Sequence, residues 1–147
     1  MEGIIMANAA AQVFASFLDS KDLKYEIVKE DESMTVLKTG VGLENTQRVL
    51  VVFYFDNSCD NVAVRAGSFI DPIPSAKVSK ALEAINKINR EYRWLKFTMD
   101  TDDNTITAAI DAVIQLDSCA EECYELFMRT ANIVDSAYPE MMAALWG

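Results

Sequence analysis

The stretch RVLVVFYF, from Arg48 to Phe55, decides how the fold of this chain is interpreted. It is apolar at nearly every position, whereas a strand with one face in water alternates apolar with polar residues. Both faces of this strand should therefore be covered. We expect it to be the central strand of a β-sheet, with the other elements arranged around it.

Before this strand, the sequence predicts a helix and a hairpin of two strands. Apolar residues three and four positions apart predict the helix from Met6 to Ser20. The alternation from Leu23 to Lys29 is typical of a half-buried strand. After a polar turn, Met34 to Val41 should form the second strand, which Gly40 and Gly42 end where the backbone must bend.

After the central strand, the sequence predicts a fourth strand, a helix with Ser75 as its N-cap, a pair of strands and a long final helix. The expected ranges are Val62–Ile70, Ser75–Tyr92, Leu95–Met99 and Ile106–Leu116, with the final helix beginning at Ser118. Ser118 and Glu121 have the spacing of a capping box, and Pro139 should kink or restart the last helix. The order helix, four strands, helix, two strands, helix predicts an α+β domain with a mainly antiparallel sheet.

Length and composition predict one domain over residues 1–147. Of the 147 residues, 51% are hydrophobic, so the chain can bury a continuous core without disulfides or metal. No run reaches the roughly 20 apolar residues of a membrane-spanning helix. The first residues, Met1 and Glu2, include no basic region before an apolar one. We therefore expect a soluble, cytoplasmic protein that does not bind membranes.

Charge and residue usage exclude several kinds of chemistry. The formal net charge is −10, which repels nucleic acid, and the sequence has no histidine. Without histidine there are no Ser-His or Cys-His nucleophile pairs, and most zinc sites are excluded. Motifs for binding phosphates or dinucleotides are also missing from the sequence. We expect no catalytic residue, cofactor or metal, and hence no enzyme.

Four cations interleaved with three aromatic rings mark the end of the second predicted helix: Lys87, Arg90, Arg93 and Lys96 with Tyr92, Trp94 and Phe97. Such a pattern resembles a surface that stacks bases and binds phosphates. Cations in a last helical turn are also stabilised by the helix dipole, and Asp100, Asp102 and Asp103 could neutralise them. We therefore interpret the cluster as the junction between a helix and a strand.

The acidic turn after this cluster resembles a calcium loop in part. Asp100, Asp102, Asn104 and Asp111 have the spacing of loop positions one, three, five and twelve. However, Thr105 replaces the glycine that the sharp turn needs, and position twelve lacks the bidentate glutamate. We expect a solvated hairpin turn at this place and no calcium site.

The three cysteines have no arrangement typical of a metal site or a disulfide. Cys119 and Cys123 are one helical turn apart, and Cys59 is far from both in the sequence. We expect three free thiols in a reducing compartment. The dipole at the start of the final helix could favour the thiolate of Cys119.

Soft apolar side chains end the chain: Met141, Met142, Leu145 and Trp146. Such side chains suit a surface that binds varied protein partners or a second copy of the chain. They would equally suit a cap over the hydrophobic core. We retain these four residues as candidate protein-binding residues, with a core role as the alternative.

Several features together resemble the YbjN family of bacterial sensory transduction regulators. They are Asn86-x-x-Asn89 at the end of a helix, Lys96-Phe97, an acidic turn and a long alternating strand, and the resemblance extends from about Ala10 to Tyr138-Pro139. The family is similar in fold to the acidic chaperones of type III secretion systems. Those chaperones are α+β homodimers that hold extended segments of other proteins. The resemblance thus implies a homodimer with a protein-binding role.

Asn86 and Asn89 are weak helix formers whose amides can bond to neighbouring backbone. We interpret them as a structural polar pair that ties the second helix to the loop or strand beside it. The alternative is a polar ligand site beneath the helix.

Two classes of function remain open. The first is a non-enzymatic protein-binding module, chaperone-like or regulatory. The second is a small-ligand sensor or a small enzyme that uses carboxylates or thiols. An exposed apolar groove or an open sheet edge would favour the first, and a deep polar pocket the second.

Overall fold

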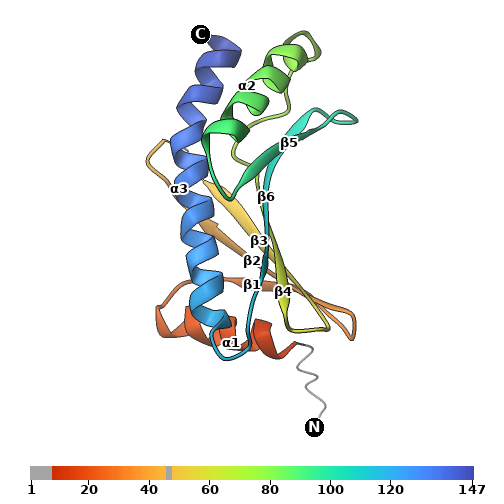
Figure 1. Cartoon of the computed structure of the whole chain (residues 1–147), viewed down its shortest axis with the longest axis vertical. Coiled ribbons are helices and arrows are strands. Elements are labelled where there is room, and N and C mark those ends of the chain that lie inside the picture. Colours follow the sequence, from red (N-terminus) through yellow and green to blue (C-terminus); the bar gives the residue numbers. More distant parts are fainter. Residues whose placement is uncertain (1–7, 46–47) are drawn as a thin grey trace.

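The computed structural model describes residues 8–45 and 48–147. These residues form the α+β arrangement that the sequence predicts, with three α-helices and a six-stranded antiparallel sheet (Figure 1). In order, the elements are α1 (Ala9–Ser20), β1 (Glu26–Glu30), β2 (Met34–Val41), β3 (Val49–Asp56), β4 (Asn61–Gly67), the short 3-10 turn η1 (Ser75–Lys77), α2 (Val78–Glu91), β5 (Lys96–Asp100), β6 (Thr105–Val113) and α3 (Cys119–Trp146).

The strands lie in the order β1-β2-β3-β4-β6-β5, so β3 is an inner strand, as predicted. Only one of its two faces is fully buried, however. The buried side chains on this face are Val49, Val51, Phe53 and Phe55, and those between them are half-buried. The prediction that both faces are covered is therefore wrong, because α1 and α3 pack against one side of the sheet and leave the other side open (Figure 1).

The core is centred on aromatic rings that join the two layers. Phe53 of β3 lies 4.8 Å from Phe14 of α1 and 6.4 Å from Phe127 of α3, between ring centroids. Tilted ring pairs at these separations are favourable beyond their burial alone. One strand residue thus holds both helices against the sheet.

The first helix begins at Ala9, and the predicted start at Met6 lies outside the described residues. Asn8 is its N-cap, because the Asn8 side-chain oxygen accepts the N–H of Ala11 at 2.9 Å. The Asn8 amide nitrogen donates to the carbonyl oxygen of Asp56, at the end of β3. The helix start is therefore fixed to the central strand.

The strand β1 is shorter and more exposed than the sequence predicts. Every residue of Glu26–Glu30 is exposed, including Ile27, and the pairing with β2 shifts register between Ile27 and Lys29. As an edge strand with a bulge, it has neighbours on one side only, which explains why alternation did not produce a half-buried strand.

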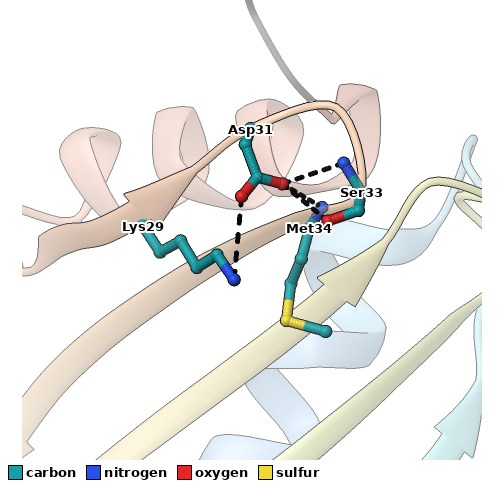
Figure 2. Close-up of polar contacts among 4 residues, drawn as sticks. All are labelled: Lys29, Asp31, Ser33 and Met34. Carbon is teal, nitrogen blue, oxygen red and sulfur yellow. Dashed lines mark hydrogen bonds and ion pairs between the residues drawn. The ribbon is translucent and has the colours of Figure 1, made fainter.

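The turn between β1 and β2 is organised by one carboxylate. An oxygen of Asp31 accepts the N–H groups of Ser33 and Met34 at 2.9 and 3.0 Å, and the Ser33 hydroxyl at 2.7 Å (Figure 2). Lys29 lies 3.6 Å from the other carboxylate oxygen. These bonds, led by that of the Ser33 hydroxyl, lower the pKa of Asp31.

The sequence predicted that Gly40 bends the chain at the end of β2, but the structure shows no bend there. Gly40 pairs with Leu50 inside the regular β2–β3 ladder, and no described glycine has a positive φ angle. A Cβ atom at this position would collide with the guanidinium group of Arg48. The space beside this glycine is occupied by the side chain of Arg48, the residue that precedes β3.

The second helix differs from its prediction at the start and on one face. Ser75 begins the turn η1, and Lys77 occupies the N-cap of α2 without a capping side chain, so Ser75 does not cap the helix. Ile85 and Ile88 are buried as expected, but Leu82 is 45% exposed. The contact face of α2 is centred on the two isoleucines, and Leu82 lies at its margin.

The final helix starts without the predicted capping box. Ser118 is the N-cap residue but makes no side-chain hydrogen bond to the helix. Instead, Glu122 accepts the backbone N–H of Gln115 at 2.9 Å. The prediction is wrong because the carboxylate of the next residue, rather than that of Glu121, reaches back to the preceding loop.

Of the two outcomes predicted at Pro139, a kink or a restart, the restart does not occur, because the final helix continues through this residue. Proline has no N–H to bond the carbonyl of Asp135, four residues earlier. That carbonyl accepts the side-chain amide of Asn45 at 3.0 Å, and the Asp135 carboxylate accepts the backbone N–H of Asn45 at 2.6 Å. The loop before β3 is thereby attached to α3.

Replacing Phe53 tests the aromatic core. Phe53→Ala should lower the free energy of unfolding by about 3 to 5 kcal/mol, because it removes contacts to both helices and leaves a cavity. Leu82→Ala is the control, since it removes a side chain of α2 that is 45% exposed and should cost clearly less. Urea titration of both variants measures the difference, and equal losses would contradict this account of the core.

Candidate functional site

An exposed apolar groove lies beside the end of β6. It has a volume of about 470 Å³ and is lined by Trp94, Ala112, Val113, Ile114, Glu121, Glu122, Glu125, Leu126 and Arg129. Two of its apolar side chains are unusually open to solvent, because Val113 is 82% exposed and Trp94 is 56% exposed. We call this surface the Trp94 groove.

The backbone holds Trp94 in an uncommon conformation. Its φ angle is 74°, in the left-handed region that bulky residues rarely adopt. The Arg129 guanidinium carbon lies 5.0 Å from the Trp94 ring centroid, and the Arg129 Nε atom lies 2.8 Å from a carboxylate oxygen of Glu125. A strained residue with a positioned, exposed ring is the kind of outlier that suggests a functional site.

One wall of the groove is a strand edge without a partner among the described residues. The last pair between β5 and β6 joins Lys96 to Ala109, whereas β6 continues to Val113. On the other side, β6 remains paired with β4 up to Val113. The end of β6 therefore has one free edge, and it faces the Trp94 groove.

The charge of the groove is negative. Glu121, Glu122 and Glu125 line it, against the single cation Arg129, which is paired with Glu125. The apolar floor and the acidic rim come from different elements, since the floor includes the end of β6 and the rim is the first part of α3.

The sequence analysis grouped Trp94 with four cations, but the structure does not join them into one surface. Lys87 lies 3.8 Å from Glu140 of α3. The Lys96 amine donates to the carbonyl oxygens of Asn89 and Tyr92, at 2.7 and 2.8 Å, and so caps the C-terminus of α2. Trp94 instead contacts Arg129, which is distant in the sequence.

The acidic turn makes hydrogen bonds within itself rather than with the cations of α2. Asp100 accepts the N–H of Asp102 at 2.9 Å, and Asp103 accepts the Thr105 hydroxyl at 2.6 Å. This hydroxyl bond is the main cause that lowers the pKa of Asp103. Asp111, the last residue of the calcium pattern, lies in β6 and pairs with Arg65 at 2.6 Å.

The two asparagines of α2 differ in their contacts. The Asn89 amide joins α2 to β5, because it donates to the carbonyl of Phe97 at 3.0 Å and accepts the Phe97 N–H at 2.8 Å. Asn86 is exposed and makes no such bond in the described part of the chain. The Asn89 side chain therefore satisfies both backbone hydrogen-bonding groups of Phe97.

The four candidate residues at the chain end do not form one surface. Met141 and Leu145 are each 1% exposed and belong to the core. Met142 and Trp146 line a second cavity of about 500 Å³, in which Arg48, Asp71 and Tyr138 provide polar groups. Of the four candidates, only Met142 and Trp146 could contact a partner in this arrangement.

The cysteines are free thiols, and the two in α3 are buried. Burial raises the pKa of the Cys119 thiol, and the carboxylate of Glu122 raises it further. Burial also raises the pKa of Cys123. The expectation that the helix dipole favours the Cys119 thiolate is therefore wrong, because desolvation outweighs it.

Two carboxyl groups meet between α2 and α3. The main cause that raises the pKa of Glu140 is a side-chain hydrogen bond to Glu91, which protonated Glu140 donates, and burial is the next cause. Lys87 opposes these effects weakly. A proton at this position therefore stabilises the contact between the two helices.

Replacing Glu140 with glutamine should stabilise the protein at neutral pH. Because folding raises the pKa of Glu140, its stabilising contribution is complete below the ordinary value of 4.5 and is lost as the pH rises through the folded-state pKa. Glutamine does not ionise, so Glu140→Gln should avoid the loss of stability that ionisation of Glu140 causes. Thermal melts should show a higher midpoint at pH 7 and no gain near pH 3, whereas Glu83→Gln, the charge-matched control on α2, should show no such pattern.

The tie between α2 and β5 can be tested with the two asparagines. Asn89→Ala leaves both backbone groups of Phe97 without their partner and should cost about 1 to 3 kcal/mol. Asn86→Ala changes an exposed residue and should stay within about 0.5 kcal/mol of the parent. Urea unfolding measures both, and a loss at Asn86 equal to that at Asn89 would overturn the assignment.

Within residues 8–45 and 48–147, no helix is both long and apolar enough to cross a membrane.

Comparison with solved structures finds a similar fold in a known protein. It is found in the crystal structure of YbjN, a "putative transcription regulator" from E. coli, with 12% sequence identity and a TM-score of 0.54. The similarity covers 88% of this chain and 91% of that one. At this level of identity, the match concerns the fold alone. A search of curated proteins finds no match.

A family model places the chain more specifically. The model of the YbjN family, described as "Putative bacterial sensory transduction regulator", matches residues 10–143. The match includes all strands of the sheet and most of the three helices. This chain therefore belongs to the YbjN family.

Proposed function

We propose that this protein is a non-enzymatic regulatory module that acts by binding another protein. The observation that carries the proposal is the Trp94 groove, where Val113 and Trp94 are exposed beside a free strand edge. Exposed apolar surface of this kind is unfavourable in water and is typical of protein contacts. The regulatory part rests on the description of the YbjN family.

The environment of the thiols supports a binding role over catalysis. A cysteine reacts as the thiolate, and the raised pKa values of Cys119 and Cys123 keep both protonated at neutral pH. Both side chains are buried among core residues. They are therefore poorly placed to attack a substrate.

The second cavity favours an alternative function, that of a small-ligand sensor. Arg48 and Asp71 give this cavity charges of both signs, and Tyr138 and Trp146 provide aromatic walls. A small polar molecule with an apolar part would fit such a lining. Ligand-dependent thermal stabilisation that Arg48→Met abolishes would favour the sensor over the protein-binding module.

We further propose that the chain acts as a homodimer through the open face of its sheet. The middle of this face is apolar, with half-buried Leu50, Val52 and Tyr54. Cations on it, Lys38 and Arg65, are matched by acidic residues that share the same face, among them Glu26 and Asp111. A face with both signs of charge can be complementary to itself, as a two-fold contact requires.

Light scattering during size-exclusion chromatography tests the dimer. The parent protein should have twice its chain mass of 16.4 kDa. Val52→Arg places a third cation between Lys38 and Arg65, its neighbours in the sheet, and should give a monomer. Leu82→Arg, on the surface of α2, is the control and should remain dimeric. A monomeric parent at all concentrations would contradict the proposal.

Site-specific cross-linking in cells tests the protein-binding role. A photoreactive amino acid in place of Val113 should give adducts with a defined partner protein, identified by mass spectrometry. The same amino acid in place of Leu82, which is also exposed, should not. Trp94→Ala should remove the adducts at Val113. If both positions give the same products, the groove is not a specific binding surface.

A further inference from the structure

We propose that the Trp94 groove binds an extended, positively charged segment of a partner protein, which adds as a strand to the free edge of β6. This inference rests on the proposed protein-binding function and specifies the chemistry of the partner. Three separate features of the groove support it: the free backbone groups, the exposed ring and the acidic rim.

The backbone of β6 presents hydrogen-bonding groups to the groove. The N–H of Ile114 donates to the carbonyl of Asp60 on the β4 side, at 2.9 Å. Successive residues of a strand direct their N–H and C=O groups to opposite sides. The corresponding groups of Asp111 and Val113 therefore point away from β4, towards the side where β5 has already ended at Lys96. An extended segment can pair with these groups, as in other cases of strand addition.

The Trp94 ring stands at the end of this free edge, where the segment would enter. In the sheet, β5 would have to continue through Leu95 and Trp94 to cover β6, but the left-handed backbone of Trp94 turns the chain away. The same turn presents the ring beside Ala112 and Val113. The ring thus supplies an apolar contact for alternate side chains of the added strand.

The acidic rim decides the charge of the segment. Glu121, Glu122 and Glu125 lie along the groove. Because Arg129, the only cation of its lining, is paired with Glu125, the charges of Glu121 and Glu122 are left without a cation in the lining. A segment with lysine or arginine at alternate positions would meet these carboxylates, whereas an acidic one would be repelled. The net charge of −10 adds long-range attraction for a basic partner.

A second copy of this chain fits the groove less well. Its edge strands are β1, with the sequence EIVKE, and β5, with the sequence KFTMD. The first carries more acidic than basic residues, and the second carries one of each. Neither would supply the positive charge that the rim favours, so we assign the groove to a different protein.

A synthetic peptide provides the test. The probe is a labelled peptide of alternating lysine and valine, about nine residues long, so that it extends past the free edge of β6. The protein is the full chain with Trp146→Phe, which leaves Trp94 as the only tryptophan. We expect saturable binding with a change in Trp94 emission, and an affinity that falls as salt is raised.

Two control peptides separate the parts of the inference. A peptide with glutamate in place of lysine should bind at least about tenfold more weakly, because it meets the acidic rim. A lysine–valine peptide with N-methylated valines keeps the charge but lacks donors for strand pairing, and it should weaken to a similar extent. Equal binding of either control overturns the proposal.

Variants of the protein test the same points from the other side. Val113→Pro removes an outward N–H that no described residue uses, and it should bind the peptide about tenfold more weakly than Val113→Ala. Glu121→Gln with Glu125→Gln should reduce the salt dependence of binding. Leu82→Ala, the exposed control, should bind like the parent, and unchanged binding by Val113→Pro would overturn strand addition.

The outcomes distinguish this inference from the proposed function. If cross-linking at Val113 captures a defined partner but the lysine–valine peptide does not bind, the protein-binding role stands and strand addition by a basic segment is wrong. If neither experiment gives a specific signal, both are wrong. Preferential binding of a helical peptide with the same charge would also overturn the extended form of the segment.

Discussion

The contact of Phe53 with Phe14 and Phe127 is the interaction on which the rest of the structure depends. It joins the central strand to two helices that are far apart in the sequence. Because α1 and α3 pack on the same face, their burial leaves the opposite face of the sheet without cover. The position of α3 also places its first turns beside β6, which creates the Trp94 groove. Core packing and surface chemistry are therefore consequences of the same contact.

The sequence predicted the order of elements well, because hydrophobic periodicity reports which residues face the core. Met34–Val41 agrees with β2 at both ends, and the strand predicted from Arg48 to Phe55 differs from β3 by one residue at each end. The errors concern contacts between elements, about which the periodicity of a single segment gives no information. Gly40 was interpreted as a bend, but the space beside it is taken by the side chain of Arg48, the residue that precedes β3. Edge exposure of β1 likewise depends on strand order.

The candidate site could be predicted only in part. Sequence analysis singled out the segment that contains Trp94, since aromatic and basic residues are concentrated there, but it grouped the ring with its sequence neighbours. The actual partner, Arg129, comes from another element, and local pattern gives no information on that contact. Val113 belonged to a predicted strand, yet its free edge follows from where β5 stops pairing. Such an edge is a property of the assembled sheet and not of either strand.

The proline in α3 has a consequence beyond the helix itself. In a helix interior each carbonyl is normally bonded to the amide four residues later, which leaves it less available to a passing loop. Pro139 removes one of these donors, and Asn45 uses the acceptor that becomes available on Asp135. Any substitution that returned an N–H at position 139 would compete with Asn45 for it. The two positions should therefore be energetically coupled although they are distant in the sequence.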